Sequence, residues 1–181
     1  VERTHGAEVV RGVGSFGGAF SAKAIAAMAD PILVASTDGV GTKVELGAQL
    51  RRVRSLGHDI VNHCVGDVLV QAARPLFFLA YIASSTLDAD LVADMVTGMA
   101  EACAASGCTL LGGETAEMPG VYTAGSFDIA GTLVGVAERL IARRFRLHPS
   151  SSAVVNGSRA ASSNAFRFDF AYAHHVQPMK N

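Results

Sequence analysis

The hydrophobic and polar positions of this chain follow two periods, one typical of strands and one typical of helices. Apolar runs predict buried strands at residues 32–35 and 76–83, and residues 108–111 and 127–136 are also predicted to form strands. Apolar residues at helical spacing predict helices over 19–29, 57–73 and 88–107, the last capped by Asp88 and ended by Gly107. Alternating strands and helices favour a layered α+β (α/β) domain with helices packed against one face of a sheet.

Composition places the chain among single-domain proteins with a substantial core. Of its 181 residues, 50% are hydrophobic and 17% charged, and the formal net charge is −1. These values argue against wholesale disorder and against nucleic acid as a partner. No apolar segment reaches the length of a membrane span, no signal pattern is present, and the 3 cysteines lack a CxxC spacing. We therefore expect a reducing, cytoplasmic location and no membrane partner.

The character of the sequence changes after Glu138. Residues 1–138 hold the periodic segments, whereas 139–181 mix basic, small polar and aromatic residues with little periodicity. We expect a main domain over 1–138 and an irregular tail over 139–181. The first residue is Val1 rather than an initiator Met, so further residues are expected before it.

A polar loop directly follows the first of the strands predicted from continuous apolar runs. Residues 36–43 read Ser-Thr-Asp-Gly-Val-Gly-Thr-Lys. Asp38 offers a carboxylate for a hard cation such as Mg²⁺, and Lys43 offers an ammonium group for phosphate oxygens. The two glycines permit a close approach of the backbone to a ligand. Taken alone, the stretch is more typical of a tight turn between two strands.

A second glycine-rich stretch, residues 12–18, satisfies the GxGxxG spacing. With a helix expected over 19–29 and an acid at Asp38, it has the layout of a dinucleotide-binding unit. The preceding segment, residues 8–11, is too short and too polar for the central strand of a parallel sheet, which disfavours this alternative. A flexible loop that contacts phosphate is the favoured interpretation.

Acidic side chains recur on two further elements. Asp59, His63 and Asp67 are spaced i, i+4, i+8 and therefore share one helix face. Residues 112–120, which include Glu114, are predicted to form a second glycine-hinged acidic loop after a strand. Each feature alone is compatible with a solvated surface. Together with Asp38 they indicate a site for Mg²⁺ and a polyphosphate, without a Walker GxxxxGK[ST] motif.

Several strings of the chain, taken together and in order, resemble one family of enzymes. They are residues 3–5 (RTH), 12–20, 36–43, 57–65 (GHDIVNHCV), 76–79 and 111–122 (LGGETAEMPGVY). These strings resemble the family of phosphoribosylformylglycinamidine cyclo-ligase, also called aminoimidazole ribonucleotide synthetase, over residues 3–138. The resemblance implies an N-terminal ATP-binding domain with a mixed sheet backed by helices, and a homodimer in which the sheets of two copies join.

The resemblance also implies a reaction and residue roles. ATP and Mg²⁺ activate the amide oxygen of formylglycinamidine ribonucleotide by phosphorylation, and the amidine nitrogen closes the ring of aminoimidazole ribonucleotide, a step of purine biosynthesis. Lys43 and His63 are implied as catalytic residues, and the implied metal ligands are Asp38, Asp67 and Glu114. The residues implied to bind ATP are Asp38, Gly39, Gly41, Thr42, Lys43, Asp59, Asp67, Gly112, Gly113 and Glu114. The loop implied to cover substrate or phosphate contains Gly12, Gly14, Ser15, Phe16, Gly17 and Gly18.

Two of the departures from the family pattern bear on the candidate site. Gly66 stands where the family usually has Asn, and Ala80 stands where it usually has Asp, so one candidate carboxylate is missing. Nothing after Glu138 resembles the second domain of the family. The leading hypothesis is therefore a truncated cyclo-ligase. A catalytically inert ATP-binding or dimerisation module is the alternative, and a dinucleotide-binding oxidoreductase is less favoured.

Overall fold

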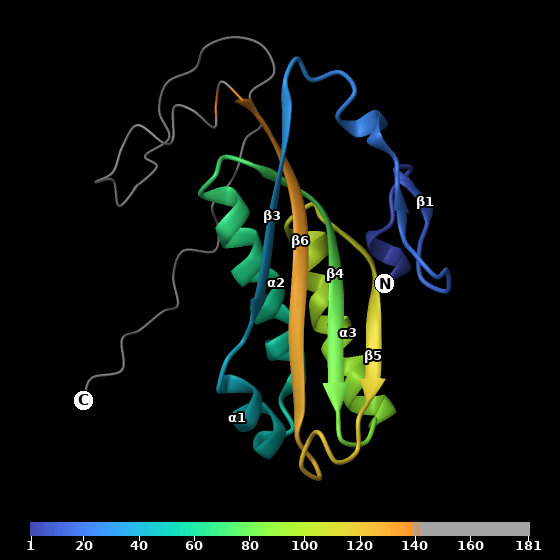
Figure 1. Cartoon of the computed structure of the whole chain (residues 1–181), viewed down its shortest axis with the longest axis vertical. Coiled ribbons are helices and arrows are strands. Elements are labelled where there is room, and N and C mark those ends of the chain that lie inside the picture. The colour runs from blue at the N-terminus through green and yellow to red at the C-terminus, as the bar shows by residue number, and fades with distance from the viewer. Residues whose placement is uncertain (140, 142–181) are drawn as a thin grey trace, which may run out of the picture. The chain divides into compact units, whose positions relative to one another are not determined.

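A four-stranded sheet forms the centre of the fold in this computed structural model, which describes residues 1–139 and 141. Its strands lie in the order β3 (Pro31–Gly39), β6 (Phe127–Glu138), β4 (Arg74–Ser84) and β5 (Thr109–Glu117), as Figure 1 shows. Strand β6 runs antiparallel to both of its neighbours, whereas β4 and β5 are parallel. The sheet is therefore mixed, as the family resemblance implies.

The register of the sheet places residues of both candidate motifs in one row. Asp38 pairs with Gly131, which pairs in turn with Ala80. Ala80 also pairs with Gly113 on its other side. Because neighbouring strands lie about 4.8 Å apart, Asp38 and Gly113 are separated by three spacings, or about 14 Å. The two motifs thus lie at opposite edges of the sheet.

Two long helices, α2 (Val53–Leu69) and α3 (Ala89–Ala105), cover one face of the sheet and lie behind it in Figure 1. Between the helices and the strands lies a core of fully buried side chains that includes Ile60, Phe78 and Met99. Burial of a side chain of this size contributes about 1.5–3 kcal/mol. Strand alternation leaves Leu33 and Leu79 exposed on the opposite face, which no helix of the described residues covers.

Helices α2 and α3 are in backbone contact because each carries a glycine at their crossing. A Cβ built on Gly57 would meet the carbonyl oxygen of Met95, and one built on Gly98 would meet that of Arg54. A side chain at either position would therefore separate the helices. At the surface of the crossing, Arg54 Nη2 lies 2.9 Å from Glu101 Oε1.

An N-terminal segment packs along the outer edge of β5. It comprises the 3-10 helices η1 (Glu2–Thr4) and η2 (Ala22–Ala24) and the antiparallel strands β1 (Val9–Arg11) and β2 (Ala19–Phe20). The Leu110 N–H donates to Thr4 Oγ1 over 3.0 Å, and the Leu110 carbonyl oxygen lies 3.0 Å from His5 Nε2. Side chains of this segment therefore satisfy backbone groups of β5 that another strand would otherwise pair.

Two helix predictions need correction, and one helix was not predicted. Residues 19–29 form no continuous helix, because β2 pairs with β1 and only the short η2 turn follows. The alanines of this stretch favour a helix, and strand pairing overrides that propensity. The helix predicted over 57–73 begins at Val53 and ends at Leu69. Helix α1 (Lys43–Leu50), which the sequence patterns do not predict, follows the Asp38 motif directly.

The acidic loop predicted over 112–120 is wrong in its first half. Residues 112–117 continue β5 and pair with β4 as far as Ser84 and Glu117. Parallel pairing extends the strand through two glycines, which strand propensity alone disfavours.

Both predicted ends of the third helix are confirmed. Asp88 Oδ1 accepts the N–H groups of the first turn of α3, and Gly107 has φ +63°.

Within residues 1–139 and 141, no helix combines the length and the hydrophobicity that a membrane span requires. Nearly all of the tail predicted over 139–181 lies outside the described residues. The domain boundary at Glu138 therefore stays a prediction.

Candidate functional site

Three polar side chains of α2 face β3 and the start of α1; we call Asp59, His63 and Asp67 the α2 ladder. Asp67 Oδ2 accepts a hydrogen bond from Ser36 Oγ over 2.6 Å. His63 Nδ1 lies 3.4 Å from Asp38 Oδ2. The helical spacing of the ladder brings all three side chains to one side of α2, which confirms the shared face predicted from the sequence.

Lys43 extends the α2 ladder at the start of α1. Its Nζ lies 2.7 Å from Asp59 Oδ2, and half of the Lys43 side chain is exposed. An ion pair this exposed contributes about 0–1 kcal/mol, so Lys43 can exchange Asp59 for a phosphate oxygen at little cost. N–H groups of the first turn of α1 already donate to the carbonyl oxygens of Gly41 and Thr42. The exposed Lys43 ammonium is therefore the charged group of this motif that an anion could reach.

Cys64 is fully buried next to the α2 ladder, and its Sγ lies 3.5 Å from the Gly131 carbonyl oxygen. Burial, and then the carboxylates of Asp38 and Asp67, raise the pKa of the Cys64 thiol from 9.0 to about 11. The thiol therefore stays protonated at neutral pH and acts as a packing group rather than a nucleophile.

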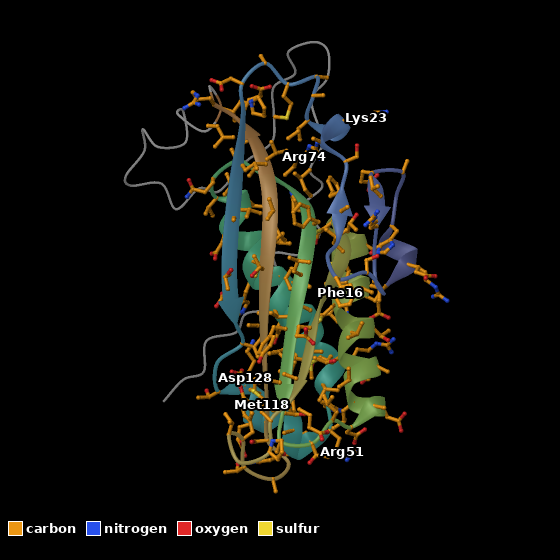
Figure 2. All side chains as sticks on the ribbon, turned by 45° about the vertical axis from the view of Figure 1, so that its right-hand side comes forward. Phe16, Lys23, Arg51, Arg74, Met118 and Asp128 are labelled. Carbon is orange, nitrogen blue, oxygen red and sulfur yellow. The ribbon has the colours of Figure 1, made fainter. Side chains whose placement is uncertain are left out.

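A second group of candidate residues surrounds a cavity of about 610 Å³ at the opposite edge of the sheet, which we call the β5 pocket. Its wall is formed by the glycine loop (residues 12–18), by Leu79, Ala80 and Ile82 of β4, by residues 110–115 in β5, and by Val1 and Val96. Glu114 is exposed, and its Oε1 accepts the Thr115 N–H over 3.0 Å. Figure 2 shows Phe16 between the N-terminal hairpin and the edge of the sheet.

The geometry of the glycine loop excludes the dinucleotide-binding alternative. The loop joins β1 to β2, which are antiparallel. A dinucleotide fingerprint needs a buried parallel strand before the glycines and a helix directly after them, so that the helix N-terminus meets the pyrophosphate. Neither element flanks this loop.

The residues predicted from the sequence thus form two groups rather than one. Asp38 lies with the α2 ladder at the β3 edge, whereas Gly112, Gly113 and Glu114 lie with the glycine loop at the β5 edge. Glu114 pairs with Tyr81 and shares its helix-free face of the sheet. No three His, Cys, Asp or Glu side chains of the described residues come together as a metal site. The predicted metal ligands Asp38, Asp67 and Glu114 therefore do not converge within this chain.

Two site residues were not selected from the sequence. Ser36 precedes Asp38 by two positions in β3, so strand alternation places both side chains on one face, and this signal was available. Val96 lines the β5 pocket from α3, although its helical spacing predicts only a core position. The place of Val96 depends on how α3 crosses the sheet, which no local pattern indicates.

Comparison with known proteins identifies the class to which this fold and these motifs belong. The family described as AIR synthase related protein, N-terminal domain, matches residues 20–137. Thiamine-monophosphate kinase from Stenotrophomonas maltophilia K279a has a TM-score of 0.60 at 16% identity, covering 76% of this chain and 40% of that one. HypE from E. coli has a TM-score of 0.52 at 16% identity, with the same coverage of 76% and 40%. These two structures show the fold alone.

The chain belongs to the AIR synthase related family and carries its N-terminal domain. Its curated relatives are named phosphoribosylformylglycinamidine cyclo-ligase, which confirms the family inferred from the motifs. The relative from Finegoldia magna is 50% identical over 139 residues, 77% of this chain and 40% of the relative. The relative from Gloeobacter violaceus is 52% identical over 139 residues, which cover 77% of this chain and 41% of the relative. The relative from Parasynechococcus marenigrum is 46% identical over 168 residues, which cover 92% of this chain and 48% of the relative. The chain thus spans less than half the length of each.

Proposed function

We propose that this chain forms the ATP-binding part of a phosphoribosylformylglycinamidine cyclo-ligase. The proposed reaction converts formylglycinamidine ribonucleotide and ATP into aminoimidazole ribonucleotide, ADP and phosphate, in purine biosynthesis. The observation that carries this proposal is the 46–52% identity to relatives of that name over 138–168 residues. Because the chain spans less than half of those relatives, ATP binding without turnover is the alternative outcome.

The α2 ladder and Lys43 suit the phosphoryl-transfer half of this reaction. The amide oxygen of the substrate attacks the γ-phosphorus of ATP, and ADP leaves. Attack of the amidine nitrogen on the amide carbon then expels that oxygen as phosphate and closes the ring. Lys43, with its exposed and exchangeable partner Asp59, would offset charge on the transferring group. His63, whose Nδ1 lies 3.4 Å from Asp38 Oδ2, would accept the proton released on ring closure.

Mg²⁺ fits the β3 edge better than the β5 edge. This ion is usually held by one or two carboxylates together with phosphate oxygens and water. Asp38 and Asp67 supply two carboxylates from β3 and α2 close to the exchangeable Lys43 pair. We assign the metal of Mg·ATP to these two residues, where it would neutralise phosphate charge. Glu114 lies across the sheet and would not join them.

A homodimer through the helix-free face of the sheet is part of the proposal. Leu33, Leu79 and Tyr81 expose 61%, 36% and 37% of their surface there. Gathered apolar side chains on one face are typical of an interface. Light scattering tests this: we expect a dimer for the unaltered chain and a monomer for Leu79→Glu. If the unaltered chain is a monomer, the proposed dimer is contradicted, but the proposed reaction is not.

A cytoplasmic location completes the proposal. The three cysteines of the chain, Cys64, Cys103 and Cys108, are buried and free. Thiols persist in reducing compartments, where the small-molecule substrates of purine biosynthesis are also made. Imaging of the tagged full-length protein would test this location.

Calorimetry followed by a turnover assay tests the reaction. We expect the 181-residue chain to bind Mg·ATP, and Lys43→Ala to weaken that binding at least tenfold. Lys23→Ala is the matched control, because Lys23 lies on η2, away from the α2 ladder. ADP release that depends on formylglycinamidine ribonucleotide supports the enzyme. Mg·ATP binding without ADP release supports a catalytically inert ATP-binding module instead. Tighter binding of NAD than of Mg·ATP contradicts the proposed ATP-binding function.

A further inference from the structure

The β5 pocket has a wall that is poorly suited to phosphate. Among the described residues that line it, Glu114 carries the one ionisable side chain, and Lys, Arg and His contribute nothing. Phosphate sites are lined by Arg, by Lys or by convergent backbone N–H groups. A carboxylate in an otherwise apolar and glycine-rich wall favours the cationic part of a ligand instead.

Glu114 is available to such a ligand. Its side chain is exposed, and Oε1 accepts only the N–H of its neighbour Thr115. Among the described residues Glu114 forms no ion pair. The carboxylate therefore has unused hydrogen-bond acceptors directed at no cation of the described fold.

Phe16 is the second group that the fold leaves unused. Its relative exposure is 117%, so both faces of the ring are in water. It nevertheless lines the β5 pocket from the tip of the glycine loop. An aromatic ring held in water beside a cavity gains free energy from any apolar or cationic group that covers it.

The glycine loop is anchored at both ends and unsupported between them. A Cβ on Gly12 would overlap the His5 ring, and a Cβ on Gly18 would lie 2.5 Å from Leu111 Cγ. Gly14, with φ +94°, has no neighbouring atom within 4 Å of a built Cβ. The ends therefore stay against the β5 edge while the tip, with Phe16, has room to move over the pocket.

We propose that the β5 pocket binds a planar nitrogen cation, an amidinium group, between the Glu114 carboxylate and the face of the Phe16 ring. A carboxylate accepts two parallel N–H bonds from an amidinium, as it does from Arg. An aromatic face attracts a delocalised cation. The pocket lies across the sheet from the α2 ladder and Lys43, so this cation site is separate from the proposed phosphoryl-transfer site and does not rest on the proposed function.

Benzamidine and benzamide form a matched pair of probes for this inference. They have nearly the same shape, but only benzamidine carries the planar cation. Binding of each to the 181-residue chain is measured by titration of amide proton and nitrogen shifts, in low salt and in 0.5 M KCl. We expect benzamidine to bind at least tenfold more tightly than benzamide at low salt, with the difference shrinking as salt screens the carboxylate.

Variants assign the effect to the two residues. Glu114→Gln should weaken the binding of benzamidine at least tenfold and leave the binding of benzamide unchanged. The control Glu45→Gln, which removes the same charge on α1, should change the affinity for neither probe. Phe16→Leu keeps an apolar tip without a π face and should weaken benzamidine about two- to fivefold. The chain contains no Trp, so Phe16→Trp adds a single fluorophore whose emission should shift when benzamidine covers it.

The outcomes separate this inference from the cyclo-ligase proposal. Equal affinity for both probes, no binding of either, or benzamidine binding that survives Glu114→Gln overturns the amidinium site. None of these results depends on ATP. If the chain discriminates between the probes but does not bind Mg·ATP, the amidinium site is supported and the proposed reaction is contradicted. If it binds Mg·ATP but does not discriminate between the probes, the proposed reaction is supported and the amidinium site is contradicted.

Discussion

Replacing Gly57 with Ala should destabilise the fold although alanine is the better helix former. A Cβ at Gly57 would lie 2.9 Å from the Met99 nitrogen and would overlap the Met95 carbonyl oxygen. Ordinary contact begins near 3.4 Å, so α3 must retreat by about half an ångström or more, away from the buried core beneath it. Overpacking of this kind costs about 1–3 kcal/mol, against a gain of about 1 kcal/mol in helix propensity. The overlapped atom is a backbone carbonyl oxygen, which cannot rotate aside, so the cost falls in the upper half of that range and we expect a net loss of about 1–2 kcal/mol.

Thermal and urea unfolding measure this loss, with Gly66→Ala as the control in the same helix. A Cβ at Gly66 meets nothing within 4 Å, so only the gain in propensity remains, about 1 kcal/mol. For a domain of this size the melting temperature should fall by roughly 4–8 °C in Gly57→Ala and rise by roughly 4 °C in Gly66→Ala. The reasoning is refuted if Gly57→Ala is as stable as the unaltered chain, or if both variants shift in the same direction.

Three further changes have outcomes that follow from the structure. The pKa of the Cys64 thiol is raised to about 11 in the folded chain, so between pH 9 and about 11 this thiol ionises in the unfolded chain first. Without Mg²⁺, the free energy of unfolding should therefore fall over this range by up to about 1.4 kcal/mol per pH unit. Urea titrations of Cys64→Ala should show a shallower fall. Asp88→Ala removes the cap of α3 and should lower the melting temperature by several degrees, whereas Asp88→Asn, which keeps the acceptor, should lower it less. Ala80→Asp restores the carboxylate usual in the family in the wall of the β5 pocket and should leave Mg²⁺-dependent ATP binding at the β3 edge unchanged in calorimetry; tighter binding would show that this position holds metal.

Local patterns were sufficient for most of the secondary structure. Apolar runs identified β3 and β4, the mostly apolar segment 127–136 identified β6, and Asp88 and Gly107 marked the ends of α3. The i, i+4, i+8 spacing of the α2 ladder also predicted its shared face, because helix geometry alone determines which side chains are neighbours. The failures lie where tertiary context outweighs local propensity, as in the alanine-rich segment around β2 and η2 and the glycine-containing half of β5.

The sequence by itself determined which residues carry chemistry and to which family they belong, because motif strings and helix periodicity depend only on neighbouring positions. Only the tertiary structure decided that Asp38 and Glu114 are separated by the width of the sheet and lie on different faces. The strand order β3-β6-β4-β5 places the last strand of the described residues between earlier ones, and no local pattern encodes that insertion. The burial of apolar surface shared by all four strands and both long helices selects it, and this energy belongs to the whole assembly rather than to any segment.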